Sequence, residues 1–271
     1  MEPSDPLVVL VTGASSGIGK ACATRLAALG HRVYGASRSA PEPEAPFRAL
    51  SMDVTDDRSV AEGVRGVIEK EGRLDAVVNG AGVGLAGAIE DTDIDEAKGQ
   101  FETNFFGAFR VCRAALPLMR ERRRGTIVNI SSIAGLIAIP FQSVYSASKF
   151  ALEGFTEALR IEVSEFGIRV ALVEPGDFRT NFTRNRVRAR KSSLNPAYRE
   201  ALERALAMME RDEMNGPDPE RVAGLVARLI GKRSFRLRNL VGRVDQRMAV
   251  WLKRILPGGL FERILRKNYG C

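Results

Sequence analysis

Short apolar runs rich in β-branched residues alternate along the chain with longer amphipathic segments. The first run, Leu7 to Val11, is continuously apolar and ends at Thr12 and Gly13, which is typical of a strand buried on both faces of a parallel sheet. Further strands are predicted at residues 33–37, 49–52, 74–79, 126–131, 170–174 and 235–241. Helices are predicted at residues 18–29, 60–70, 94–121, 145–165, 196–212, 217–230 and 244–256. This order predicts an α/β fold with a doubly wound parallel sheet of about seven strands.

The regular alternation weakens after Pro175. Residues 177–216 are predicted to form an insertion between the last two strands, and residues 243–271 a basic amphipathic helical extension. No stretch has the composition of a linker between domains, so residues 1–271 are predicted to form a single domain.

The composition excludes several classes of chemistry. Three scattered cysteines are too few for a disulfide framework or a cysteine zinc site, and one histidine is too few for a multi-histidine metal centre, so no metal is predicted. The only histidine, His31, lies in the turn before the second predicted strand and away from every motif, which argues against Ser-His-Asp or Cys-His catalysis. The chain shows no secretory signal pattern and no run of about 18 apolar residues, which predicts a cytoplasmic protein. The net charge of +8 is concentrated in residues 179–271, which hold 22 Lys/Arg against 9 Asp/Glu.

A glycine-rich turn follows the first predicted strand. Gly13, Gly17 and Gly19 permit positive φ angles and a close approach of the backbone to a ligand, at the point where a helix N-terminus offers free N–H groups to a phosphate. The candidate contacts in this turn are Gly13, Ser15, Ser16, Gly17, Ile18 and Gly19. Taken alone, the same pattern also fits a glycine-rich turn that binds nothing.

This turn, the segment Asn79-Gly80-Ala81-Gly82 and the pair Tyr145-x-x-x-Lys149 stand in an order that resembles the classical short-chain dehydrogenase/reductase family over residues 7–256. The resemblance implies a Rossmann fold and a nicotinamide dinucleotide. It also implies cofactor contacts at Asn79, Ala81 and Gly82, and near the nicotinamide carboxamide at Pro175, Gly176 and Thr180. Gly80 departs from the family, which usually has asparagine there.

The end of the second predicted strand bears on which dinucleotide binds. A carboxylate there would select NAD through the ribose 2′-hydroxyl, whereas this chain has Ser37 and Arg38, and an arginine pairs with a 2′-phosphate. We therefore predict NADP(H), although Arg38 also fits a solvated surface arginine. Asp53 and Val54 match the family's adenine-contacting pair; Asp53 also fits the start of a turn.

Tyr145 and Lys149 lie four residues apart and therefore on one face of a helix. An adjacent ammonium favours the phenolate, so Lys149 is expected to lower the pKa of Tyr145 and let it act as acid and base. The resemblance implies that Ser132 positions the substrate oxygen, that Lys149 also holds the nicotinamide ribose, and that Asn104 supports a proton relay. A Tyr-Lys pair at this spacing also arises by chance on helix surfaces.

Residues 236–242 and 251–257 resemble the branch that contains 17β-hydroxysteroid and retinol dehydrogenases, which implies a lipophilic alcohol or carbonyl substrate. The family usually dimerises through the helices predicted at residues 94–121 and 145–165, so a homodimer is expected. The basic amphipathic C-terminus fits packing on the protein's own body, a subunit contact or a membrane surface. Nucleic acid is not expected as a partner. A catalytically silent NADP(H)-binding sensor or lipid-handling scaffold is the alternative to an enzyme.

Overall fold

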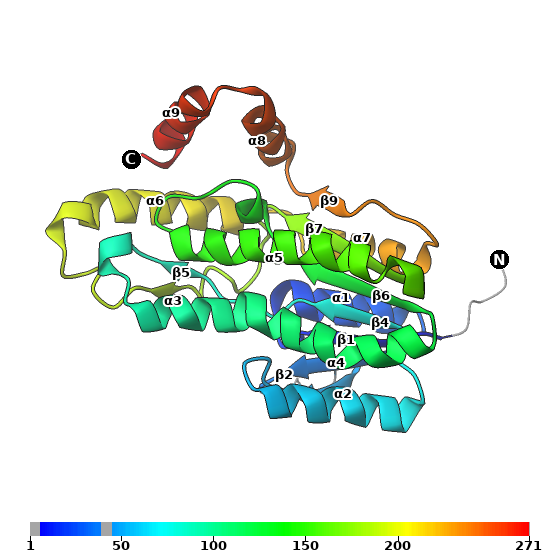
Figure 1. Cartoon of the computed structure of the whole chain (residues 1–271). Helices are drawn as coiled ribbons and strands as arrows, with labels where there is room; N and C mark the ends of the chain where they lie inside the picture. Colours follow the sequence, from blue (N-terminus) through cyan, green and yellow to red (C-terminus); the bar gives the residue numbers. More distant parts are fainter. Residues whose placement is uncertain (1–5, 39–44, 271) are drawn as a thin grey trace.

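A parallel sheet of seven strands forms the centre of the computed structural model, which describes residues 6–38 and 45–270 (Figure 1). The strands lie in the order β3-β2-β1-β4-β6-β7-β9, and every neighbouring pair is parallel. Their bounds are β1 Val8–Thr12, β2 Arg32–Ser37, β3 Arg48–Ser51, β4 Ala76–Asn79, β6 Gly125–Ile130, β7 Ile168–Pro175 and β9 Arg238–Val241. The predicted Rossmann-like fold is thereby confirmed.

Helices cover both faces of the sheet (Figure 1). One face packs against α1 (Gly17–Ala28) and α7 (Glu220–Gly231), and the other against α2 (Asp57–Glu71), α4 (Gly107–Glu121) and α5 (Ser143–Glu162). The remaining α-helices are α3 (Ile94–Phe101), α6 (Pro196–Met214), α8 (Val244–Ile255) and α9 (Gly258–Tyr269).

Alternation of side chains along β1 explains why its sequence is apolar throughout. Val8 and Leu10 enter the core under α2 and α4, whereas Val9 and Val11 enter the core under α1 and α7. Because a strand sends successive side chains to opposite faces, a strand covered on both faces has no polar side.

The register aligns polar residues at the carboxyl edge of the central strands. Thr12 is paired with Asn79, and Asn79 with Asn129. The Asn79 amide donates to Asn129 Oδ1 at 2.8 Å, and the Asn129 amide donates to Thr156 Oγ1 of α5 at 2.8 Å. These bonds hold α5 against the sheet edge at which ligand sites form in α/β proteins.

Several predicted elements need correction. The long helix expected at residues 94–121 is interrupted by a π-helical turn at Glu102–Phe106. The last strand and α7 begin later than predicted, at Arg238 and Glu220; in α7, Pro219 disfavours a helical backbone at the residue before it, Asp218, and is itself the N-cap.

Three further elements were not predicted as elements of their own. The short strands β5 (Leu85–Ala86) and β8 (Val187–Arg188) pair with each other in a separate small sheet. Helix α9 follows Pro257, where the predicted terminal helix was expected to stop. Two-residue strands are too short to give a periodic signal, so β5 and β8 could not be found from the sequence pattern.

Replacing Thr156 by valine tests the polar connection between α5 and the sheet. The substitution keeps the shape of the side chain but leaves the buried Asn129 amide without its acceptor, so we expect a loss of about 1–3 kcal/mol in the free energy of unfolding, measured by urea denaturation. The exposed Ser193→Ala serves as a control that should change stability by less than about 0.5 kcal/mol. Equal stability of Thr156→Val and the unchanged chain would contradict this account.

Candidate active site

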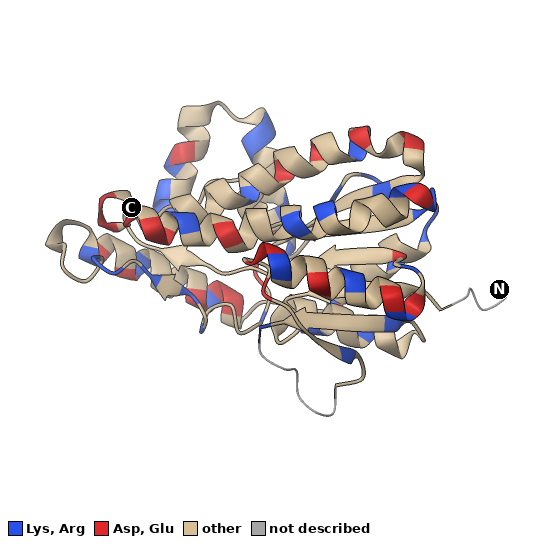
Figure 2. Cartoon of the chain, turned by 60° about the horizontal axis from the view of Figure 1, so that its bottom comes forward, with Lys and Arg blue, Asp and Glu red and all other residues tan. Residues whose placement is uncertain are grey.

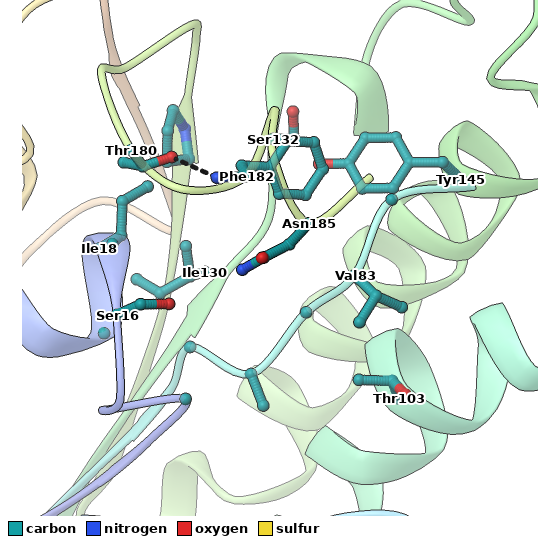
Figure 3. Close-up of a pocket in the computed structure, with 18 of the residues that line it drawn as sticks. Ser16, Ile18, Val83, Thr103, Ile130, Ser132, Tyr145, Thr180, Phe182 and Asn185 are labelled. Carbon is teal, nitrogen blue, oxygen red and sulfur yellow. Dashed lines mark hydrogen bonds between the residues drawn. The ribbon is translucent and has the colours of Figure 1, made fainter. Parts of the chain in front are cut away.

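A cavity of about 620 Å³ runs along the carboxyl edge of the sheet, from the turn before α1 to Tyr145 on α5. Figure 3 shows Ser132, Phe182 and Tyr145 together, Ser16 and Ile18 on the opposite side, and Asn185 reaching into the space between. The predicted site residues that line it are Gly13, Ser15, Ser16, Gly17, Ile18, Gly19, Ser37, Arg38, Asp53, Val54, Ala81, Gly82, Ser132, Tyr145, Lys149, Pro175, Gly176 and Thr180.

The glycines are required by the packing of the turn between β1 and α1. Gly13 has φ +70°, and a Cβ atom on it would lie 2.7 Å from the carbonyl oxygen of Gly80; a Cβ atom on Gly19 would lie 2.2 Å from the carbonyl oxygen of Gly13. Thr12 Oγ1 fixes the facing loop by accepting from the N–H groups of Gly80 and Ala81, at 3.1 and 3.2 Å. The turn is thus held open toward the cavity with the N-terminus of α1 at its wall, which fits a pyrophosphate.

The end of the cavity opposite Tyr145 is formed by residues at the carboxyl ends of β2 and β3. Asp53 Oδ1 accepts from the backbone N–H and the hydroxyl of Thr55, at 2.9 and 2.8 Å. Burial by itself would raise the pKa of Asp53, but these two hydrogen bonds and the positive charges of Arg38 and Arg110 outweigh it and lower the pKa. Asp53 therefore remains ionised. Arg38, which is exposed and lines the cavity, interacts with the Asp53 carboxylate through its positive charge.

Tyr145 is buried beside Ser132 and Phe182. Its ring centroid lies 5.6 Å from that of Phe182, and the Ser132 hydroxyl lies near enough to the phenol to lower its pKa. Ser132 is itself fixed, because its Oγ accepts from the N–H of Ala134 at 3.1 Å. This arrangement places two hydroxyl groups side by side at the cavity wall (Figure 3).

The pKa of Tyr145 does not move in the direction expected from the sequence. Burial raises it to about 12; the nearby Ser132 hydroxyl lowers it, whereas the negative charges of Glu213 and Asp177 raise it further. Lys149 does not oppose this effectively, because its Nζ donates to the carbonyl oxygen of Ile130 at 3.0 Å and lies 5.9 Å from the Tyr145 ring centroid. The phenol therefore remains protonated at neutral pH.

Burial also acts on Lys149, lowering its pKa to about 8, while the carboxylate of Glu153 acts in the opposite direction. A Cβ atom placed on Gly82 would lie 3.8 Å from Lys149 Nζ and 3.5 Å from Asn104 Oδ1. Lys149 and Asn104 therefore both lie close to Gly82, which has no side chain that would separate them from the backbone.

Asn104 lies behind the cavity wall rather than in it. Located in the π-helical turn, it accepts from the N–H of Val83 at 2.9 Å and donates to the carbonyl oxygen of Val83 at 3.1 Å and to Ser148 Oγ at 3.2 Å. The extra residue of a π turn reorients the local side chains, which agrees with the frequent use of such turns at functional sites. In this structure Asn104 holds the loop after β4.

Asn79 is likewise not part of the cavity lining. Its amide donates to Asn129 Oδ1 and, at 3.4 Å, to Cys112 Sγ, so the side chain lies between the central strands and α4. Asn79 therefore supports the central sheet through its side chain, and the cofactor contact expected there stays a prediction. Its neighbours Ala81 and Gly82 do line the cavity.

Several residues of the cavity wall near Tyr145 were not predicted individually from the sequence. Glu213 of α6 lines the cavity there and is held by bonds from Thr183 and Arg186. Other unpredicted lining residues are Val83, Ile133, Ile139, Gln142, Asp177, Phe178, Phe182, Asn185 and Val187. Asp177 could have been found from its place inside the Pro-Gly motif, but Glu213 comes from a distant helix and has no local signal.

Comparisons with known proteins agree with this geometry. A sequence model described as short chain dehydrogenase matches residues 7–191. A protein of Bacteroides thetaiotaomicron named 3-ketodihydrosphingosine reductase is 42% identical over 264 residues, which cover 97% of this chain and 98% of the relative.

Two further similarities extend the comparison. Human retinol dehydrogenase 8 is 42% identical over 191 residues, which cover 65% of this chain and 60% of that protein. The crystal structure of a short-chain dehydrogenase from Streptomyces avermitilis has a TM-score of 0.81 at 35% identity and covers 97% of this chain and 98% of its own. This chain therefore belongs to the short-chain dehydrogenase/reductase family and is an NAD(P)-dependent oxidoreductase acting on CH–OH groups.

Proposed function

We propose that this enzyme uses NADP(H) to interconvert a carbonyl and an alcohol on a lipophilic substrate, and that reduction is its favoured direction. The observation that carries the proposal is the pair of hydroxyls of half-buried Ser132 and buried Tyr145, in a cavity that is also lined by the glycine turn and Arg38. A catalytically silent binding protein would have no need of a protonated phenol beside a fixed hydroxyl.

The preference for NADP(H) rests on charge at the end of β2. Arg38 lines the cavity next to Ser37, and the nearby carboxylate of Asp53 is already bonded to Thr55. An exposed guanidinium offers strong charge-assisted hydrogen bonds to a phosphate group, which only NADP(H) carries on its adenosine ribose.

The protein's own residues supply the proton and hold the substrate oxygen. The Ser132 hydroxyl, fixed by Ala134, donates to the carbonyl oxygen and orients it, and the phenol of Tyr145 donates the proton that this oxygen needs. When bound, the reduced nicotinamide supplies the hydride. A tyrosine with a raised pKa is fully protonated at neutral pH, which suits a proton donor in the reductive direction.

The lipophilic substrate is inferred from the wall beyond Tyr145. Ile133, Ile139, Phe182 and Val187 line this part of the cavity. Apolar walls with a few polar groups are typical of sites that bind small lipophilic molecules. The names of the two relatives, a 3-ketodihydrosphingosine reductase and a retinol dehydrogenase, support a long-chain carbonyl or alcohol.

Titration of the purified protein with NADPH and NADH, followed by nicotinamide fluorescence, tests the cofactor. We expect tighter binding of NADPH, and Arg38→Asp is expected to weaken NADPH binding by about 10- to 100-fold, because the charge-assisted bonds are lost and the carboxylate repels the 2′-phosphate, while NADH binding is not weakened. Arg233→Asp, which alters an exposed arginine outside the cavity, is the matched control. A preference of the unchanged protein for NADH would overturn the assignment.

Turnover with a panel of steroid, retinoid, long-chain and small polar carbonyls tests the reaction. Tyr145→Phe removes the proton donor while leaving the ring in place beside Phe182, so the rate of reduction should fall by about 10²- to 10⁴-fold with NADPH binding nearly unchanged. Full activity of Tyr145→Phe would refute the mechanism. Tight NADPH binding without turnover of any carbonyl would favour the silent binding protein.

The pH profile of kcat/KM for reduction tests the electrostatics at Tyr145. Reduction needs the protonated phenol and declines as pH rises through its pKa. The negative charge of Asp177, whose own pKa burial raises to about 7, raises the pKa of Tyr145, so Asp177→Asn should move this decline to lower pH. Asp218→Asn, at an exposed position outside the cavity, should leave the profile in place. If the decline of kcat/KM in Asp177→Asn occurs at the same pH as in the unchanged protein, or at higher pH, this account is contradicted.

A further inference from the structure

Helices α8 and α9 lie outside the layers that cover the sheet and are fixed to the body by their inner faces (Figure 1, top). Val250 of α8 and Phe261 of α9 are buried in a small core with Ile137, and Ile133 and Leu136 pack against this core. Gln246 of α8 donates to the Asp177 carboxylate and accepts from the Asp177 N–H at 3.2 Å. The position of α8 is thus determined by contacts next to the active site.

The outer face of α8 is also apolar. Val244, Met248, Trp251 and Ile255 follow one another at intervals of four, three and four residues, so they form one stripe along the helix. Their exposed fractions are 69, 54, 60 and 54%. Leu260 and Ile264 continue the exposed apolar surface on α9 at 43% each. Isolated exposed apolar residues are ordinary, but a continuous stripe rimmed by charge marks an interaction surface.

The charge around the stripe is strongly positive. Residues 243–270 contain seven Lys/Arg and two Asp/Glu. Arg247 and Arg254 on α8 and Arg263 and Lys267 on α9 are exposed, and Figure 2 marks such residues in blue. An amphipathic helix pair with this combination of an apolar stripe and basic flanks has the composition of a segment that lies in a bilayer interface.

We propose that the outer face of α8 and α9 binds the surface of an anionic lipid bilayer, with the stripe in the headgroup region and the basic residues against lipid phosphates. The proposal does not depend on the reaction proposed above. Within residues 6–38 and 45–270, no helix is long and apolar enough to cross a membrane, so this contact would be peripheral.

A second copy of this chain fits the same surface less well. A twofold dimer brings a patch against itself, so the exposed basic residues of one copy, among them Arg247, Arg254 and Arg263, would lie near the same residues of the other. Like charges across an interface disfavour association, whereas phosphate headgroups neutralise them.

The outer face of α8 lies close to the active-site cavity, so a lipid contact there bears on how substrate reaches the enzyme. The inner face of α8 touches Ile133, the residue after Ser132, and Gln246 touches Asp177 in the cavity wall. A bilayer on the outer face would therefore lie one helix away from the reacting end of the cavity. This would bring the enzyme to the phase in which a lipophilic substrate is concentrated.

Trp251 provides a probe at the centre of the stripe, because it is the only tryptophan in the chain. With vesicles of phosphatidylcholine containing about 30% phosphatidylglycerol, we expect a blue shift of its emission, quenching by brominated acyl chains, and sedimentation of the protein with the vesicles. Binding to pure phosphatidylcholine vesicles should be weaker by about tenfold or more, and added salt should reduce binding to the anionic vesicles.

Two variants on the surface and one control separate the lipid contact from general effects. Met248→Glu with Ile255→Glu, and separately Arg247→Glu with Arg254→Glu, should abolish the blue shift and the sedimentation while circular dichroism and NADPH binding stay unchanged. Leu194→Glu, at an equally exposed apolar residue outside α8 and α9, should bind vesicles like the unchanged protein.

The proposal fails if anionic vesicles change neither the emission of Trp251 nor the sedimentation of the protein. It also fails if the blue shift occurs without lipid, rises with protein concentration together with dimerisation in light scattering, and is abolished by Met248→Glu with Ile255→Glu. That second outcome would assign the surface to a contact between copies of this chain. Neither outcome depends on whether a carbonyl substrate is turned over.

Discussion

The hydrogen-bonded row formed by Thr12, Asn79 and Asn129 at the carboxyl edge of the sheet is the constraint on which the site depends. Thr12 fixes the loop that follows β4, Asn79 joins β4 to β6, and Asn129 connects the sheet to Thr156 on α5. Since Tyr145 and Lys149 lie on α5 and Ser132 follows β6, the same bonds set the distances between the reacting groups. The amide groups of Asn79 and Asn129 are paired, whereas Asn79 Oδ1 is buried without a hydrogen-bond partner in the described structure. Such buried polar contacts are costly to break, which makes the arrangement specific.

Burial is the dominant electrostatic influence on the reacting groups. It raises the pKa of Tyr145 to about 12 and lowers that of Lys149 to about 8, so both groups are pushed toward their neutral forms. Asp177 responds in the same way, with a pKa raised to about 7. A protonated phenol beside the fixed hydroxyl of Ser132 is the state that a proton donor needs, and it follows from packing rather than from a single charged partner.

Helix α8 has one face against the active-site cavity and the opposite face on the outer surface of the protein. Gln246 and the residues around Val250 hold α8 against the wall of the cavity, while Trp251 and its apolar neighbours point away from it. An amphipathic helix normally has one apolar face, so a helix with two needs two partners. The protein core provides the first, and the proposed bilayer contact provides the second.

The seven strands of the main sheet, the glycine turn and the Tyr145–Lys149 pair could be predicted from the amino-acid sequence, because each depends on local periodicity or on fixed spacing. Ser132 was selected through the resemblance to the family. The chain's resemblance to the short-chain dehydrogenase/reductase family is confirmed. Three features could be seen only in the folded structure. Asn79 and Asn104 lie behind the cavity wall, and Glu213 of α6 lines the cavity near Tyr145. The pKa of Tyr145 is raised, not lowered. The physical reason is that burial and charge at a site are sums over elements far apart in the chain, and only the packed fold brings those elements together.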